Sequence, residues 1–209
     1  MRRDDPARRR DRARQALAAL VVALAAWLAA VPARAHPHVW IDAAATFVFA
    51  DKKVVGVRVA WAFDELFSDF LRRQFDPKKT GAFDADALPK MKADLAGLKE
   101  FNYFTHIRVG GKVHKVSDVA EFRPAIRDKN VIYSFLVPLP APVDPLATPV
   151  SVSLYDDSFY VDVALEKGDP VRMEGTRGAC QFNVIDDREN PIYYGLVFPK
   201  RVDLKCRKG

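Results

Sequence analysis

Two of the four histidines in the 209-residue chain lie within one short segment, His36-Pro37-His38. The segment follows Ala33-Arg34-Ala35, whose two alanines are the small residues that a signal peptidase accepts. Cleavage after Ala35 would make His36 the first residue of the mature protein. Its amine and imidazole both lose protons near neutral pH, so together they could chelate a metal ion, and His38 could add a third nitrogen. The segment therefore predicts an amino-terminal metal site.

Pro37 limits the geometry of such a site. Proline has no backbone N–H, which excludes a square-planar site that uses successive deprotonated backbone amides. The remaining arrangement, an amine with imidazoles, is a histidine brace, and nitrogen-rich ligation suits nickel, cobalt, zinc and copper. The alternative is that His36 and His38 belong to a disordered polar chain start.

A third histidine or a carboxylate is expected to complete the site. The candidates are His106, Asp64, Asp156 and Asp157. Each has a structural alternative, because strand histidines are often buried or solvent-facing, Asp64 is suited to cap a helix, and the other two aspartates are ordinary turn residues. His114 is expected to face solvent.

Residues 1–35 have the three parts of an export signal: a basic start, an apolar run over residues 16–31 and a small-residue cleavage site. The apolar run is shorter than the roughly 20 residues that span a bilayer, which disfavours a retained membrane anchor. We therefore expect a periplasmic protein with no stable membrane anchor after cleavage. The signal holds a net charge of +5 out of the chain's +6, so the mature part gives no indication of nucleic-acid binding.

Cys180 and Cys206 are the two cysteines of the chain. An even pair in an exported protein predicts a disulfide, worth roughly 3 kcal/mol for a loop of this length. The alternative, a pair of metal thiolates, is disfavoured because the chain lacks a Cys-x-x-Cys motif.

Alternating apolar residues predict a β-hairpin over residues 39–63, after which helical spacing predicts helices over 64–75 and 86–100. A second hairpin is expected over 101–116, and the proline-rich segment 138–149 is expected to be a stiff linker. Further strands are expected over 131–137, 150–154, 159–165, 171–174, 180–185, 193–198 and 202–206. The fold class is α+β: an antiparallel β-rich, sandwich-like domain over 36–209, with a helix–loop–helix insertion over 64–100.

The loop from Asp76 to Ala87 has the register of an EF-hand, with an acid at its first position and Gly81 at its sixth. Lys78 occupies the third position, and Ala87 stands where a bidentate glutamate belongs. Two carboxylates and a lysine make a poor calcium cage, so we expect an EF-hand-like turn that does not bind calcium.

No nucleophile elbow, phosphate-binding glycine loop or His-Glu-x-x-His motif is present in the sequence. We therefore predict no catalytic residue and no familiar hydrolytic activity.

Several segments together resemble the family called domain of unknown function 1007. They are His36 to Trp40, Trp61 to Ser68, the loop at Asp76, Tyr103 to Thr105, Leu154 to Asp156 and Phe159-Tyr160. The resemblance implies a periplasmic component of an uncharacterised ABC-type transport system, often associated with nickel/cobalt-type membrane exporters or permeases. It implies no catalytic residue.

The leading hypothesis is a periplasmic accessory protein that holds a divalent transition metal at its amino terminus for a membrane metal transporter or permease. Two alternatives stay open. One is a copper histidine-brace redox enzyme, and the other is a metal-free periplasmic interaction domain.

Overall fold

The computed structural model of the chain describes residues 14–22 and 38–208. Contacts divide the chain into two units, Met1–Ala35 and His36–Gly209. Residues 14–22 of the first unit form a helix. Within the described residues, no helix has both the length and the apolar character that crossing a membrane requires.

The central hairpin of the second unit consists of β1 (Val39–Ala50) and β2 (Lys53–Phe63), which pair antiparallel. Asp51 and Lys52 form the turn between them and both have positive φ, as a tight two-residue hairpin turn requires. On its other edge β1 pairs in parallel with β8 (Val161–Leu165) and then with β9 (Val171–Gly175). The strand that begins at the predicted metal site is therefore paired on both sides.

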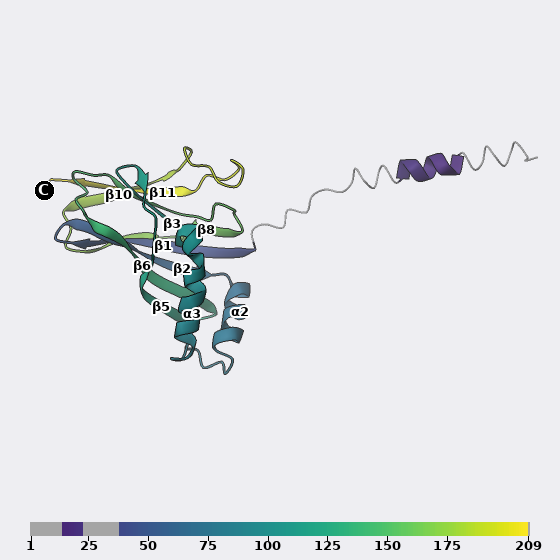
Figure 1. The fold of residues 1–209 in the computed structure, drawn as a ribbon, viewed down its shortest axis with the longest axis horizontal. Helices are drawn as coiled ribbons and strands as arrows, with labels where there is room; N and C mark the ends of the chain where they lie inside the picture. The colour runs from purple at the N-terminus through teal and green to yellow at the C-terminus, as the bar shows by residue number, and fades with distance from the viewer. Residues whose placement is uncertain (1–13, 23–37, 209) are drawn as a thin grey trace, which may run out of the picture. The chain divides into compact units, whose positions relative to one another are not determined.

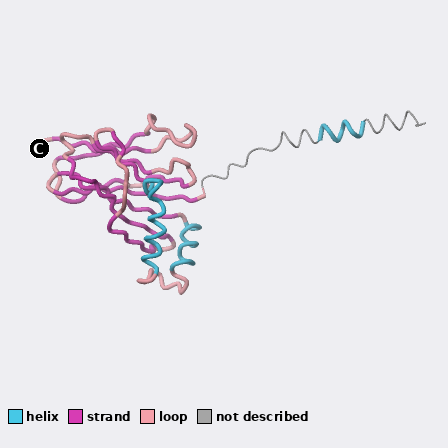
Figure 2. The backbone as a smooth tube through the Cα atoms, viewed as in Figure 1, coloured by secondary structure: helices cyan, strands magenta, loops and turns pink. Residues whose placement is uncertain are grey.

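Two sheets make up the second unit (Figures 1 and 2). The first has the order β5-β6-β2-β1-β8, with β9 beside β1, and the second has the order β10-β11-β7-β3-β4. The remaining strands are β3 (Thr105–Val109), β4 (Lys112–Val113), β5 (Ala120–Arg127), β6 (Asn130–Val143), β7 (Val150–Leu154), β10 (Ala179–Asp186) and β11 (Lys200–Arg207).

Both sheets contribute side chains to one hydrophobic core. Phe47, Trp61 and Phe135 of the first sheet and Ile107 and Val152 of the second are almost fully buried. The Trp61 and Phe135 rings meet edge to face with their centroids 4.8 Å apart. The predicted α+β, β-rich class is confirmed, and the first sheet is mixed rather than purely antiparallel.

A helix–loop–helix follows the hairpin, as predicted. It contains α2 (Glu65–Phe75), α3 (Ala87–Ala96) and the 3-10 helix η1 (Gly97–Phe104). In the loop, the Asp76 carboxylate accepts hydrogen bonds from the Thr80 and Gly81 amides and from the Thr80 hydroxyl, at 2.8–2.9 Å. These bonds, led by the one from the Thr80 amide, hold the pKa of Asp76 below its usual value. Asp76 thus fixes the backbone of the loop between α2 and α3.

Two predicted segments were wrong, and one strand was missed. Residues 138–143 are not a linker but the second half of β6, and they can contain prolines because β5 pairs with β6 only up to Leu136. Residues 193–198 are not a strand, since Tyr193 and Tyr194 have positive φ and Ile192 and Val197 form only an isolated bridge. The strand β5 was missed because Pro124 interrupts it.

Cys180 and Cys206 form the predicted disulfide. They are directly opposite each other in the antiparallel pair of β10 and β11, so the disulfide links two strands that already pair.

Ser68 of α2 joins the helix to the sheet. Its side chain is fully buried, its hydroxyl donates to Phe63 O at 3.1 Å, and its oxygen accepts from Val131 N at 2.9 Å. We predict that Ser68→Ala lowers the free energy of unfolding by about 1–3 kcal/mol, because a buried amide loses its acceptor. Denaturant unfolding measures the loss. The exposed Ser117→Ala serves as control, and an equal effect of both variants would contradict this role of Ser68.

Candidate functional site

His38 is the first described residue of the second unit and immediately precedes β1. Its backbone N–H donates to Tyr160 O at 2.9 Å, which continues the pairing of β1 with β8 by one step. Its imidazole lies against the Tyr160 ring, with the centroids 4.6 Å apart. The backbone and the ring of His38 are therefore both held against the loop that leads into β8. Its predicted partner His36 lies outside the described residues.

The outer face of the sheet beside His38 carries two carboxylates. Side chains alternate along a strand, so Trp40 and Asp42 follow His38 on the exposed face of β1. Asp162 of β8 is the register partner of Trp40 and lies on that face too. Burial, and then the charge of Asp42, raises the pKa of Asp162 above its usual value. Sequence reasoning missed both aspartates, although Asp42 could have been found from its even spacing to His38.

Asp64 lies next to this strand but acts as a structural cap. Its Oδ1 accepts from Phe67 N and its Oδ2 from Trp40 N, both at 2.9 Å, while its own N–H donates to Trp40 O. One carboxylate thus begins α2 and holds the start of β1. The predicted N-cap role is confirmed, and the ligand role stays a prediction.

Asp156 is buried and organises the loop that carries Tyr160. Its carboxylate accepts from the Ser158 amide and hydroxyl and from the Tyr160 and Val161 amides, at distances of 2.8–3.1 Å. It acts on His38 indirectly, because it fixes the backbone that bears Tyr160. Asp157, which follows it, is exposed.

His106 is buried on β3 and stacks on Tyr155, with the ring centroids 3.7 Å apart and the planes 4° from parallel. Its Nε2 lies 3.1 Å from Tyr155 O. A carbonyl oxygen only accepts, so Nε2 carries the hydrogen, and Nδ1 is the nitrogen left with a lone pair. Burial is the main cause that lowers the pKa of His106 below its usual value.

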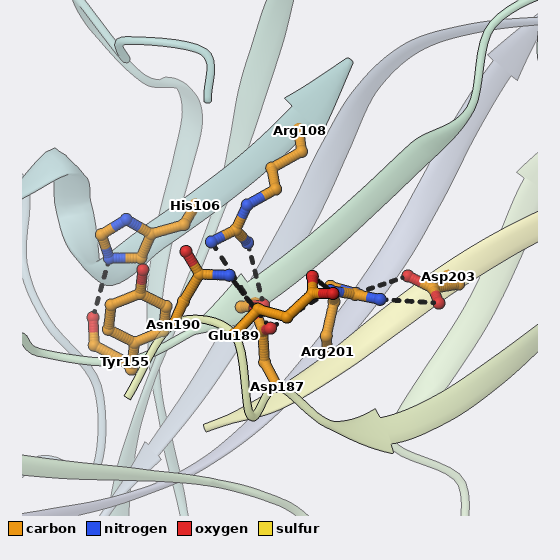
Figure 3. A network of polar contacts seen from close by, with 9 residues as sticks. His106, Arg108, Tyr155, Asp187, Glu189, Asn190, Arg201 and Asp203 are labelled. Atoms are coloured by element: carbon orange, nitrogen blue, oxygen red, sulfur yellow. Dashed lines mark hydrogen bonds and ion pairs between the residues drawn. The ribbon is translucent and has the colours of Figure 1, made fainter. Parts of the chain in front are cut away.

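A buried ion network lies beside His106 (Figure 3). The fully buried Asp187 accepts from Arg201 at 3.1 Å and from the Asn190 amide at 3.0 Å, and its other oxygen lies 3.6 Å from Arg108. Arg201 also binds Asp203 at 2.8 Å. Because Arg108 is on β3 and Arg201 on β11, the network ties two strands of the second sheet through the segment after β10. This arrangement is structural.

The structure does not gather the predicted ligands into one centre. Within residues 14–22 and 38–208, no three histidine, cysteine or acidic side chains lie close enough together to hold a metal ion. The His38 ring contacts Tyr160, and Asp64 caps α2. Asp156 accepts hydrogen bonds within its own loop, and His106 bonds the carbonyl oxygen of Tyr155.

The inner side of the same strands borders a cavity of about 490 Å³. Its lining comes from β1, β2, β6 and β8, from α2, α3 and η1, and from the loop of Asp156 and Tyr160. Val39, Ile41 and Val161 face this side, whereas His38, Trp40 and Asp162 follow the opposite alternation.

The family described as "Protein of unknown function (DUF1007)" matches residues 21–196, which include the hairpin, the helices and most of both sheets. The chain belongs to this family. The DUF1007 chain is also similar to an uncharacterized 15.5 kDa protein of Spirochaeta aurantia, 38% identical over 126 residues, which are 59% of this chain and 89% of the relative. An uncharacterized protein of Haemophilus influenzae is 22% identical over 152 residues, 73% of each chain. No solved structure matches the chain.

His106 should make the stability of the domain depend on pH. The unfolded histidine titrates near 6.5, whereas the folded one titrates lower, so below that pH the unfolded state binds more protons. We predict that the free energy of unfolding falls as the pH drops from 6.5 toward the folded pKa, and that His106→Gln flattens this window. Denaturant unfolding at a series of pH values measures it. His114→Gln should keep the slope, and an unchanged slope in His106→Gln would contradict the assignment.

Asp187 should carry much of the stability of the second sheet. Asp187→Asn leaves two arginines facing a neutral group in a buried site, so we predict a loss of about 3–5 kcal/mol. Glu189→Gln is the matched control, because Glu189 is 84% exposed and lies 3.5 Å from the same Arg201, and its loss should stay below about 1 kcal/mol. Calorimetric unfolding of both variants makes the comparison, and similar losses would contradict the role of Asp187.

Proposed function

We propose that this DUF1007 protein is a periplasmic accessory protein that binds one divalent transition metal ion at the amino terminus of its mature form and serves a membrane metal transporter or permease. The ligands would be the amine and imidazole of His36 and the imidazole of His38. Nickel, cobalt, zinc and copper are the candidate ions, because each accepts nitrogen ligands.

The observation that carries the proposal is the way His38 is held. Its amide binds Tyr160 O, its ring contacts Tyr160, and the next residue is already in a strand with partners on both sides. His36 is only two residues away along the chain, so the nitrogens of both residues would stay close together at little entropic cost. A chelating pair fixed in this way binds more tightly than the same two residues on a mobile tail.

The carboxylates on the outer face of the sheet support the same site. Asp42 of β1 and Asp162 of β8 lie on the exposed face of the sheet that His38 begins, and they add negative charge to that face. Asp42 is four residues, roughly 13 Å, along the strand from His38, so it can attract a cation but is too far away to be its ligand. Asp162, opposite Trp40, is the candidate oxygen ligand of the two.

The decisive experiment changes only the position of the amino-terminal amine relative to the His36 imidazole. We predict that one glycine added before His36 weakens Ni²⁺, Co²⁺, Cu²⁺ or Zn²⁺ binding by at least about a hundredfold, because the chelate ring between amine and imidazole is lost. Isothermal titration of the exported, processed protein with each ion measures this. The matched control is His114→Ala in the protein without the extension, which keeps the chain start and should bind like the parent.

Equal metal affinity with and without the glycine would contradict an amino-terminal site. Loss of metal binding in His38→Ala, together with full binding after the glycine extension, would show that the side chains bind the metal without the amine.

A further inference from the structure

The apolar cavity behind β1 shares Tyr160 with the surroundings of His38, but His38 is not among its lining residues. Its volume of about 490 Å³ falls within the roughly 300–1,000 Å³ of small-molecule pockets. The first sheet forms one side through Ile41, Trp61 and Tyr133, and the helices cover it with Phe67 and Leu98. The cavity therefore lies between the first sheet and the helices of the helix–loop–helix insertion.

The mouth of the cavity is lined by large apolar side chains that water reaches. Phe70 of α2 is 56% exposed, Phe101 of η1 is 54% exposed and Tyr160 is 49% exposed. The three come from separate elements and converge on one opening. Exposed aromatic side chains that gather around a concave apolar site are typical of binding sites rather than of ordinary surface.

The polar groups of the cavity restrict what it could bind. Trp61 lines it and is 1% exposed, and within the described residues its Nε1 is buried without a hydrogen-bond partner. Because protein atoms close off this Nε1 from solvent, it places no requirement on a ligand. The charged side chains among the lining residues are Asp94 and Asp156, and the described lining holds no lysine or arginine. An anionic ligand would therefore meet only like charge.

We propose that this cavity binds a neutral or cationic aromatic small molecule. The ligand would lie between the sheet and the helices, with its rings among Phe63, Phe67 and Phe104. Binding needs no metal ion, so the inference goes beyond the proposed function and would hold without it.

Two fluorescent probes of nearly the same shape test whether the cavity disfavours an anionic ligand. N-phenylnaphthylamine is neutral, and anilinonaphthalene sulfonate has the same ring skeleton with an anionic group. The full-length exported protein is titrated with each probe in the presence of a chelator, so that metal binding at the amino terminus cannot contribute. We expect saturable binding of one neutral probe per chain, at least about tenfold tighter than the sulfonate, because an anion in an acidic apolar site is poorly stabilised.

Two variants place the probe in the cavity. Leu98→Trp fills it and should weaken binding of the neutral probe by at least about tenfold, since a larger side chain takes the ligand's volume. Leu146→Trp is the matched control, because Leu146 is 50% exposed and lies outside the cavity lining. Circular dichroism checks that both are folded.

If Leu98→Trp does not fold, Phe101→Ala tests whether the probe binds in the cavity. It removes a ring at the mouth and should weaken the neutral probe severalfold, whereas Phe198→Ala, also at an exposed ring but outside the lining, should not.

Three results would overturn the proposal: no saturable binding of the neutral probe, equal or tighter binding of the sulfonate, or unchanged binding of the neutral probe in the folded Leu98→Trp or in Phe101→Ala. Equal metal affinity with and without the added glycine would contradict the metal site and leave these results unaffected, so the two proposals fail separately.

Discussion

The position of β1 is the constraint on which the rest of the domain depends. The strand pairs with β2 along one edge and with β8 and β9 along the other, so both edges are held by hydrogen bonds. Because side chains alternate, its inner residues belong to the core and the cavity, and its outer residues carry the histidine and the carboxylate. A register shift of one residue would exchange the two sets, so the same pairing fixes the core and the candidate metal site.

Two aspartates connect this strand to the helices and the loop around it. Asp64 caps α2 while it holds the backbone of Trp40, and Asp156 folds the loop that places Tyr160 against His38. Both are among the predicted metal ligands, and both have their carboxylate oxygens engaged by backbone amides. An aspartate that caps a helix or fixes a turn uses the same oxygens that a metal would need, so in a sequence it resembles a ligand.

Much of the fold could be predicted because local patterns and tertiary packing agree. The alternation of β1 and β2, the change to helical spacing after Phe63 and the cysteine pair each specify one structure. The failures have physical causes. Pro138 suggested a linker because a strand proline is tolerated only where no partner strand needs its N–H, and the sequence does not reveal that β5 begins at Ala120, opposite Leu136. The stacking of His106 on Tyr155 could not be predicted, because the two residues are 49 positions apart in the chain. The cavity lining comes from seven helices and strands and one loop, so no single segment could indicate it.

The central claim is that processing exposes a metal-binding chain end. The most direct measurement is native mass spectrometry of the protein purified from the export compartment, which reports its first residue and its bound metal together. We expect a chain that begins at His36 and binds one transition metal ion. A chain that begins at another residue, or one that begins at His36 and takes up no ion when nickel, cobalt, zinc and copper are supplied, would contradict it.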